Sequence, residues 1–313
     1  MTDVLLLVAG LLVLSYAADR FVLGAARLST ALRVSPVLIG AVVIGFGTSA
    51  PELLVSVLAT LRGAQDIAFG NVVGSNIANV LLVLGAAAAF RPLHVSGKTL
   101  RLELPLMIAA IVALAAITVD LHVYGWEGAL LLAGAVGAFA LIAWTALRDR
   151  EARAAMEAEL AEYEGGDVSA GRSALLAVAG LIGTLAGAQM LVQGALGVSR
   201  ALGVPEAVIG LTVVAIGTSL PELVTAVAAA RRGETDLVVG NVLGSNLFNA
   251  LLVAGASGVL DTVRLDPAFR WSSALMVLAN LFAAGMLLSG RRLGRREAAV
   301  LLAAFVGVTA FLL

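Results

Sequence analysis

The sequence contains no cysteine and only two histidines, and charged residues make up 13% of its 313 positions. The absence of cysteine excludes a disulfide framework, a thiolate metal site and thiol redox chemistry. The low charge excludes an ordinary soluble domain, since such domains carry about 25% charged residues. The formal net charge of −1 says nothing about partners, because in a membrane protein it sums charges on opposite sides of the bilayer.

Long apolar runs are what the sequence has instead. Hydrophobic residues account for 60% of it, and the mean hydropathy is +1.02. About 20 apolar residues cross a bilayer as a helix, and these runs lack the alternation of a transmembrane barrel. The N-terminal run has no basic region ahead of it, which indicates a first span rather than a cleaved signal peptide. The sequence therefore predicts an all-α polytopic membrane protein with ten transmembrane helices, at about 3–26, 36–61, 67–89, 101–120, 127–147, 173–196, 206–230, 237–259, 271–289 and 297–313.

The basic residues predict the orientation of these spans. With the N-terminus outside, sixteen of the twenty Lys and Arg residues fall in inward loops. Inward loops of membrane proteins are enriched in these residues. We therefore expect both termini outside.

The chain is an internal duplication. The stretch "GTSAPELLVSVLATLRGAQDIAFGNVVGSNIANVLLVLGA" from Gly47 returns as "GTSLPELVTAVAAARRGETDLVVGNVLGSNLFNALLVAGA" from Gly217, 170 positions later. Each copy holds five spans, an odd number, so the second copy enters the membrane from the opposite face. This predicts two inverted five-helix repeats, 1–147 and 173–313, joined by a charged cytoplasmic linker, 148–172. In transporters built this way the substrate site lies near the bilayer midplane.

Two polar stretches in each repeat carry the candidate chemistry. In the second span, Thr48, Ser49 and Glu52 have the spacing of one helix face, and Pro51 removes a backbone donor so that carbonyls near Gly45 can face a ligand. The third span carries a polar residue every four positions. The polar residues of the third span are Asn71, Ser75 and Asn79. In the second repeat, the partners of the second-span residues are Thr218, Ser219 and Glu222, and those of the third-span residues are Asn241, Ser245 and Asn249.

The donor set favours a hard cation. An intramembrane carboxylate is by default a functional-site hypothesis, and Glu52 and Glu222 each lie near the middle of a predicted span. Carboxylate, hydroxyl, amide and carbonyl oxygens are the ligands that Ca²⁺ and similar ions prefer. No imidazole or thiolate lies in the spans to favour zinc or copper. Two carboxylates supply a charge of −2, which balances one Ca²⁺ or two Na⁺.

The paired motifs "GTSAPE" with "GNVVGSNIAN" and "GTSLPE" with "GNVLGSNLFN" resemble the two α-repeats of the calcium/cation antiporter superfamily, in its prokaryotic sodium/calcium exchanger branch. The resemblance covers nearly the whole chain and places the α-repeats at about 36–89 and 206–259. It implies four cation sites in a diamond at the midplane, with spans one and six sliding across the other eight. Asn249 stands where some relatives carry aspartate, which argues against potassium coupling.

The resemblance also implies the cation ligands. Glu52 and Glu222 would be the carboxylates shared by Ca²⁺. The other implied ligands are Thr48, Ser49, Ser75, Asn79, Thr218, Ser219, Ser245 and Asn249, with the carbonyls of Gly45 and Ala215.

The implied function is secondary active antiport of Na⁺ for Ca²⁺ by alternating access, electrogenic and with net Ca²⁺ export. We expect no cofactor, nucleotide or nucleic acid partner and no enzymatic activity. We expect a monomer in the bilayer of a prokaryotic plasma membrane, with Ca²⁺ and Na⁺ as substrates. The alternatives are a Ca²⁺/H⁺ antiporter of the same fold and a cation channel. An intramembrane hydrolase using both glutamates would leave the matched Thr, Ser and Asn sets unexplained.

Overall fold

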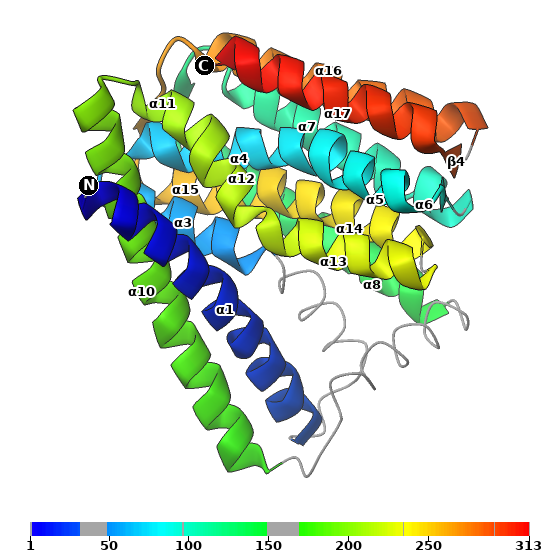
Figure 1. Ribbon diagram of the computed structural model, residues 1–313, viewed down its shortest axis with the longest axis horizontal. Coiled ribbons are helices and arrows are strands. Elements are labelled where there is room, and N and C mark those ends of the chain that lie inside the picture. Colours follow the sequence, from blue (N-terminus) through cyan, green and yellow to red (C-terminus); the bar gives the residue numbers. More distant parts are fainter. Residues whose placement is uncertain are drawn as a thin grey trace.

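The computed structural model describes residues 2–31, 49–95, 97–148, 169–233, 235–290 and 292–312. It is a bundle of long helices (Figure 1), which confirms the prediction of an all-α membrane protein with many spans. The described helices long and apolar enough to cross a membrane are Gln65–Phe90, Thr99–Ile117, Gly125–Thr145, Ala170–Leu202, Val238–Leu260 and Phe269–Gly290. A helix pair bent by 41°, Glu206–Thr218 and Leu220–Arg231, passes the same test when its two parts are taken together as one span.

The longest helices, α1 (Thr2–Ala31) and α10 (Ala170–Leu202), lie side by side at one edge of the bundle (Figure 1). Glycines hold their backbones close together. A Cβ at Gly10 would lie 2.5 Å from the Leu191 nitrogen, and one at Gly180 would lie 2.6 Å from the Phe21 Cα. Both contacts obey the 170-residue offset of the sequence, so the two helices pack as equivalents. Small residues permit this close approach of membrane helices.

The centre of the bundle is built from equivalent segments of the two sequence copies. In each copy a π-helical turn begins at an asparagine, Asn79 or Asn249; such turns occur often at functional sites. The first copy contributes α3 (Ala50–Leu61), α4 (Gln65–Ala78), η1 (Asn79–Val83) and α5 (Leu84–Phe90). The second contributes α11 (Glu206–Ile209), η2 (Gly210–Val214), α12 (Ala215–Thr218), α13 (Leu220–Arg232), α14 (Thr235–Phe248), η3 (Asn249–Val253) and α15 (Ala254–Leu260).

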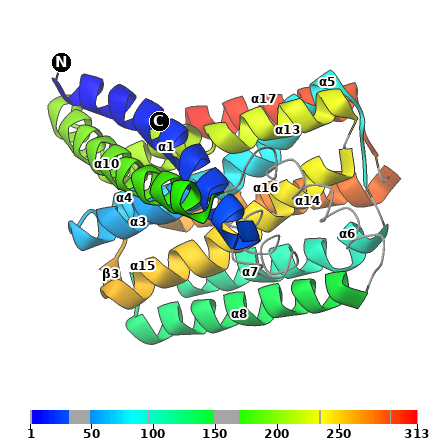
Figure 2. The same cartoon turned by 90° about the horizontal axis from the view of Figure 1, so that it is seen from below.

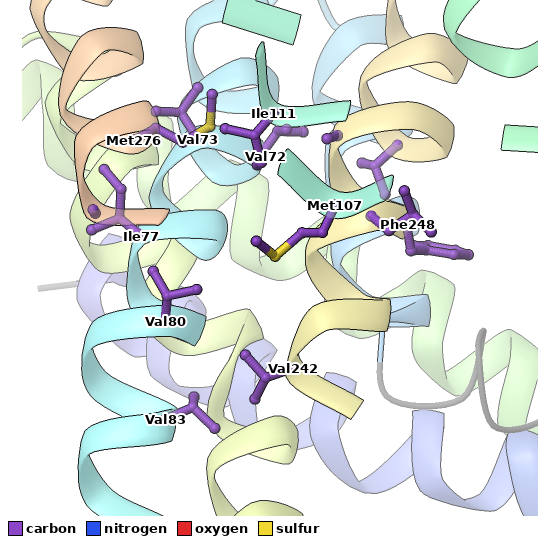
Figure 3. Close-up of a cluster of buried hydrophobic side chains, with 14 of the residues drawn as sticks. Val72, Val73, Ile77, Val80, Val83, Met107, Ile111, Val242, Phe248 and Met276 are labelled. Carbon is purple, nitrogen blue, oxygen red and sulfur yellow. The ribbon is translucent and has the colours of Figure 1, made fainter. Parts of the chain in front are cut away.

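Burial separates these central helices from the outer ones. In the run Gln65–Phe90, 83% of the span window is buried, against 22% in Gly125–Thr145. The central run carries buried polar residues, which in membrane helices usually face the bundle interior. Figure 3 shows valines and an isoleucine of α4 and η1 turned towards side chains of α14 and of the outer helices. The outer helices are α6 (Gly97–Arg101), α7 (Glu103–Ile117), α8 (Gly125–Arg148), α16 (Phe269–Gly290) and α17 (Arg295–Leu312).

Two short antiparallel strand pairs tie the copies together. Strand β1 (Leu93–His94) pairs with β4 (Arg292–Leu293), and β2 (His122–Val123) pairs with β3 (Val263–Arg264). Each pair joins one strand from each copy, and the two pairs are related by the same offset of 170. The outer helices follow this rule, since α17 packs on α5 and α8 packs on α15 (Figure 2).

Candidate functional site

In each "GTSxPE" motif a helix begins just before the proline, and in the second copy the motif separates α13 from α12, which ends at Thr218. Helix α3 begins at Ala50 and α13 at Leu220, with a proline in the first turn of each. Proline is tolerated there because the first N–H groups of a helix have no intrahelical partner. The glutamates therefore lie in the first turns of two helices, Glu52 on α3 and Glu222 on α13, where the positive end of the helix dipole favours an anion.

The starts of α3 and α13 face each other through crossed hydrogen bonds. Ser49 Oγ donates to Glu222 Oε1 at 3.2 Å, and Ser219 Oγ donates to Glu52 Oε1 at 3.4 Å. All four residues are buried. The structure corrects one interpretation of the sequence, in which Ser49 shares a helix face with Glu52. Ser49 and Ser219 precede their helices as N-cap residues, because the proline starts the helix after them, and each serine serves the glutamate of the opposite copy.

The two carboxylates are buried in a part of the chain whose described buried residues carry no positive charge. The buried residues there include both glutamates but no lysine, arginine or histidine. Glu52 Oε2 has no hydrogen-bond partner among the described residues. A buried charge is stable only when it is paired or binds a cation. The described compensation of the Glu52 charge comes from a helix dipole and the Ser219 hydroxyl, and the site suits a cation.

Asn71 organises the hydroxyls next to Glu52. Its Nδ2 donates to the Glu52 carbonyl at 3.2 Å and to Ser56 Oγ at 3.0 Å. Its Oδ1 accepts the Thr218 hydroxyl at 2.8 Å and the Ser75 hydroxyl at 3.5 Å. Since these hydroxyl protons point at Asn71, the lone pairs of Thr218 and Ser75 remain available to a cation. The sequence places Asn71 on the polar face but gives no hint of Ser56, whose counterpart in the second copy is Ala226.

Two predicted amide ligands begin the π-helical turns. Asn79 Nδ2 donates to Asn246 Oδ1 at 3.0 Å, while Asn79 Oδ1 and both amide atoms of Asn249 are buried without a hydrogen-bond partner among the described residues. Ser245 is buried one turn before Asn249. Oxygens that are buried and unsatisfied in this way are suited to ligation, because leaving them unpaired costs free energy.

The remaining predicted ligands divide into two groups. Gly45 and Thr48 lie outside the described residues. The Ala215 carbonyl accepts the Ser219 N–H at 3.1 Å, and the Thr218 hydroxyl oxygen, whose proton points at Asn71, lies 3.3 Å from it. It is therefore an acceptor within its own helix turn, while the carbonyl one turn before Pro221, which proline deprives of a donor, is that of Gly217.

Asn280 of α16 is absent from the sequence interpretation. It is fully buried, and its Oδ1 accepts from Asn246 Nδ2 at 2.9 Å. The signal that could have revealed it is a lone asparagine within the apolar run "LMVLANLFAAG". Polar residues inside membrane helices are rare and usually face the bundle interior.

A broken membrane helix that meets the other sequence copy at a buried pair of carboxylates is typical of a secondary transporter of cations. Comparison with known proteins gives the same answer. The sequence matches the sodium/calcium exchanger protein family over residues 2–145 and again over 172–313. The chain belongs to the sodium/calcium exchanger family and is a multi-span membrane cation antiporter, not an enzyme.

Relatives of known name agree with this assignment. The putative antiporter CaxA of Alkalimonas amylolytica is 37% identical over 95% of this chain and 94% of its own length. The sodium/calcium exchanger MaX1 of Methanosarcina acetivorans is 30% identical over 96% of both chains. The solved structure of the sodium-calcium exchanger NCX_Mj soaked with Na⁺ and Ca²⁺ is 31% identical, with a TM-score of 0.66 over 99% of this chain and 98% of that one.

Proposed function

We propose that this antiporter exchanges Na⁺ for Ca²⁺, with Glu52 and Glu222 as the carboxylates for which the two ions compete. The observation that carries the proposal is the crossed serine–glutamate arrangement without a buried positive side chain in the described part of the chain. Two carboxylates balance one Ca²⁺ or two Na⁺. Once one substrate has neutralised their charge, the site no longer attracts the other, so the two ions compete. The names of MaX1 and NCX_Mj add support.

The same charges explain why transport is exchange rather than free flow. A single ionised group near the bilayer centre costs about 3 kcal/mol even on the most lenient insertion scale. A site with two unbalanced carboxylates is therefore held back from crossing between the membrane faces, while a cation-loaded site is not. A channel has no such requirement, because its ions pass without the site being moved.

For the topology, we propose ten spans in two inverted repeats, 1–147 and 173–313, with a cytoplasmic linker at 148–172 and both termini outside. Support comes from the distribution of basic residues and from the two strand pairs that obey the 170-residue offset. The α1–α10 pair would move as one body across the other helices during alternating access, in a prokaryotic plasma membrane.

For the direction of transport, we propose an electrogenic exchange, in which more than two Na⁺ move for each Ca²⁺. Exchange of more than two Na⁺ for one Ca²⁺ carries net positive charge inward. Each net charge gains about 2.3 kcal/mol per 100 mV of membrane potential. With a negative interior and an inward Na⁺ gradient, the favoured direction is Ca²⁺ export.

Sodium coupling is tested by ⁴⁵Ca uptake into proteoliposomes loaded with Na⁺, K⁺ or choline at fixed pH. We expect uptake only with internal Na⁺, because Na⁺ must leave for Ca²⁺ to enter. Uptake that ignores Na⁺ but follows an imposed pH gradient would instead identify a Ca²⁺/H⁺ antiporter. Uptake that persists with internal choline and no gradient would identify a channel.

The crossed hydrogen bonds predict that Ser49→Ala and Ser219→Ala have similar effects. Each removes one hydroxyl that bonds the opposite carboxylate, and a hydrogen bond to a charged group stabilises by about 1.5–3 kcal/mol, so we expect Ca²⁺ affinity to fall by about tenfold or more. The measurement is the Ca²⁺ concentration that gives half-maximal protection against thermal unfolding. Ser272→Ala is the control, since that hydroxyl bonds the Ala268 carbonyl of its own helix at 2.9 Å. A loss in only one serine variant would contradict the crossed arrangement.

A further inference from the structure

A chain of buried asparagine amides links α16 to the cation site. Asn280 contacts Asn246 of α14, and Asn246 contacts Asn79 at the start of η1. We propose that Asn280 is a positioning residue, which acts through Asn246 to aim the Asn79 carbonyl oxygen into the site. The inference deepens the proposed function and rests on it, because the oxygen matters as a ligand only if a cation binds there.

Two backbone carbonyls fix the direction of every amide in this chain. Asn280 Nδ2 donates to the Met276 carbonyl at 2.8 Å, and a carbonyl can only accept. Asn280 therefore presents its Oδ1 to Asn246. Asn246 Nδ2 donates both to that oxygen and to the Asn76 carbonyl at 3.0 Å.

Asn246 has then only its oxygen left for Asn79. Asn79 must therefore donate from its Nδ2 to Asn246 Oδ1, at 3.0 Å. Its Oδ1 faces away from Asn246, buried and without a hydrogen-bond partner among the described residues. The orientation of this one ligand oxygen is thus set by Asn246, which is held by the Asn76 carbonyl and by Asn280 of α16, a helix outside both α-repeats.

The symmetry-related positions lack this device. The position equivalent to Asn280 is Ala110 of α7, which has no amide to offer. Asn76, the equivalent of Asn246, donates instead to Val72 of its own helix at 2.8 Å. Asn249, the equivalent of Asn79, makes no hydrogen bond among the described residues with either amide atom. The two repeats therefore present different ligands, one amide oxygen held in place and one amide free to turn.

This asymmetry has a consequence for ion preference. A fixed oxygen favours the ion whose coordination it already matches, because little ordering is needed on binding, whereas a free amide can turn to suit ions of different size. The chain of amides from Asn280 through Asn246 to Asn79, here called the Asn280 relay, thus makes the Asn79 side of the site selective among ions. The Asn249 side can adapt to ions of different size.

A double-mutant cycle tests the relay. In the full-length protein in detergent, Asn280→Leu replaces the amide by an apolar side chain of similar size, and we expect the concentration of Ca²⁺ for half-maximal thermal protection to rise by about fivefold. Asn79→Ala added to Asn280→Leu should then have much less effect than it has alone, because the oxygen is already misdirected. Asn249→Ala should keep its full effect in both backgrounds. If Asn280 only packs helices together, both added substitutions will keep their full effects, and this result would overturn the proposal.

Two controls keep the outcome clear. Ser273 lies on α16, as Asn280 does, and its hydroxyl contacts the Thr118 hydroxyl at the end of α7 at 3.1 Å; Ser273→Ala breaks this contact and should leave Ca²⁺ and Na⁺ responses unchanged. If Asn280→Leu does not fold, Asn280→Ala replaces it in the cycle, and we expect the same results. A wild-type protein that responds to neither Ca²⁺ nor Na⁺ would overturn the proposed function. The relay would still be tested by the cycle of Asn280 with Asn79 on thermal unfolding in cation-free buffer, where additive effects would overturn it.

Discussion

Glu52→Gln and Glu222→Gln should each abolish measurable Ca²⁺ exchange while leaving the protein folded. Each substitution removes half of the negative charge at the site but keeps an oxygen that can accept from the opposite serine. Even outer-shell partners of metal ligands are worth about 10–100-fold in affinity, so loss of a ligand charge should cost at least about 100-fold. The measurement is ⁴⁵Ca exchange in proteoliposomes, with Ca²⁺-dependent thermal protection of the same protein.

The unfolding temperature without cations distinguishes a loss of cation binding from a loss of folding. Without cations the two carboxylates are buried like charges, and removing one relieves that cost. The Gln variants should therefore unfold at a temperature equal to or above that of the wild type in cation-free buffer. The matched control is Glu127→Gln, since Glu127 Oε2 accepts the Tyr124 N–H at 2.9 Å at the start of α8, and an amide oxygen can do the same. A variant at Glu52 that retained exchange would remove this carboxylate from the site.

Gly180→Leu should also eliminate most exchange, for a mechanical reason. A Cβ at Gly180 would lie 2.6 Å from the Phe21 Cα and 2.9 Å from the Arg20 carbonyl carbon, and backbone atoms cannot move aside as a side chain can. Overpacking costs about 1–3 kcal/mol, so the closely packed form of α1 and α10 should become about 5- to 150-fold less populated. The measurement is the initial rate of Na⁺-dependent ⁴⁵Ca uptake.

Gly307→Leu on α17 is the matched control for this substitution. Gly307 is exposed, and no described atom lies within 4 Å of a Cβ placed there. Leucine at this position would face lipid and should leave uptake unchanged. Equal losses in the two variants would mean that glycine flexibility matters, rather than the contact between α1 and α10.

The sequence predicts those features that depend on local pattern. The described span edges agree with the predicted ones within a few residues along most of the chain, as in Phe269–Gly290 against 271–289, because apolar length alone defines a span. The offset of 170 and the two "GTSxPE" motifs also indicate in advance that Glu52 and Glu222 belong to one site. In the structure the two residues are linked through the crossed serines.

Features that depend on long-range partners were not predictable. Helical spacing assigns Ser49 to the glutamate of its own motif, but the hydroxyl donates to Glu222, 173 positions away. Spacing also says nothing about Asn280, because its role depends on contacts with Asn246 and Asn76 from other helices. An internal repeat reveals what the two copies share, whereas Asn280 and Ser56 belong to what they do not share.

The pairing of β1 with β4 constrains how the protein is made. Leu93 pairs with Leu293, so the partner of β1 is synthesised 200 residues later. At the usual 5–20 residues per second, the ribosome needs about 10–40 s to reach it. Helix α17, which packs on α5, follows β4 along the chain and therefore enters the membrane later still. Until β4 and α17 have been synthesised, the core around the Asn71 and Asn79 amides is incomplete. We therefore expect the first half, expressed alone, to insert but to depend on membrane chaperones and to be degraded rapidly.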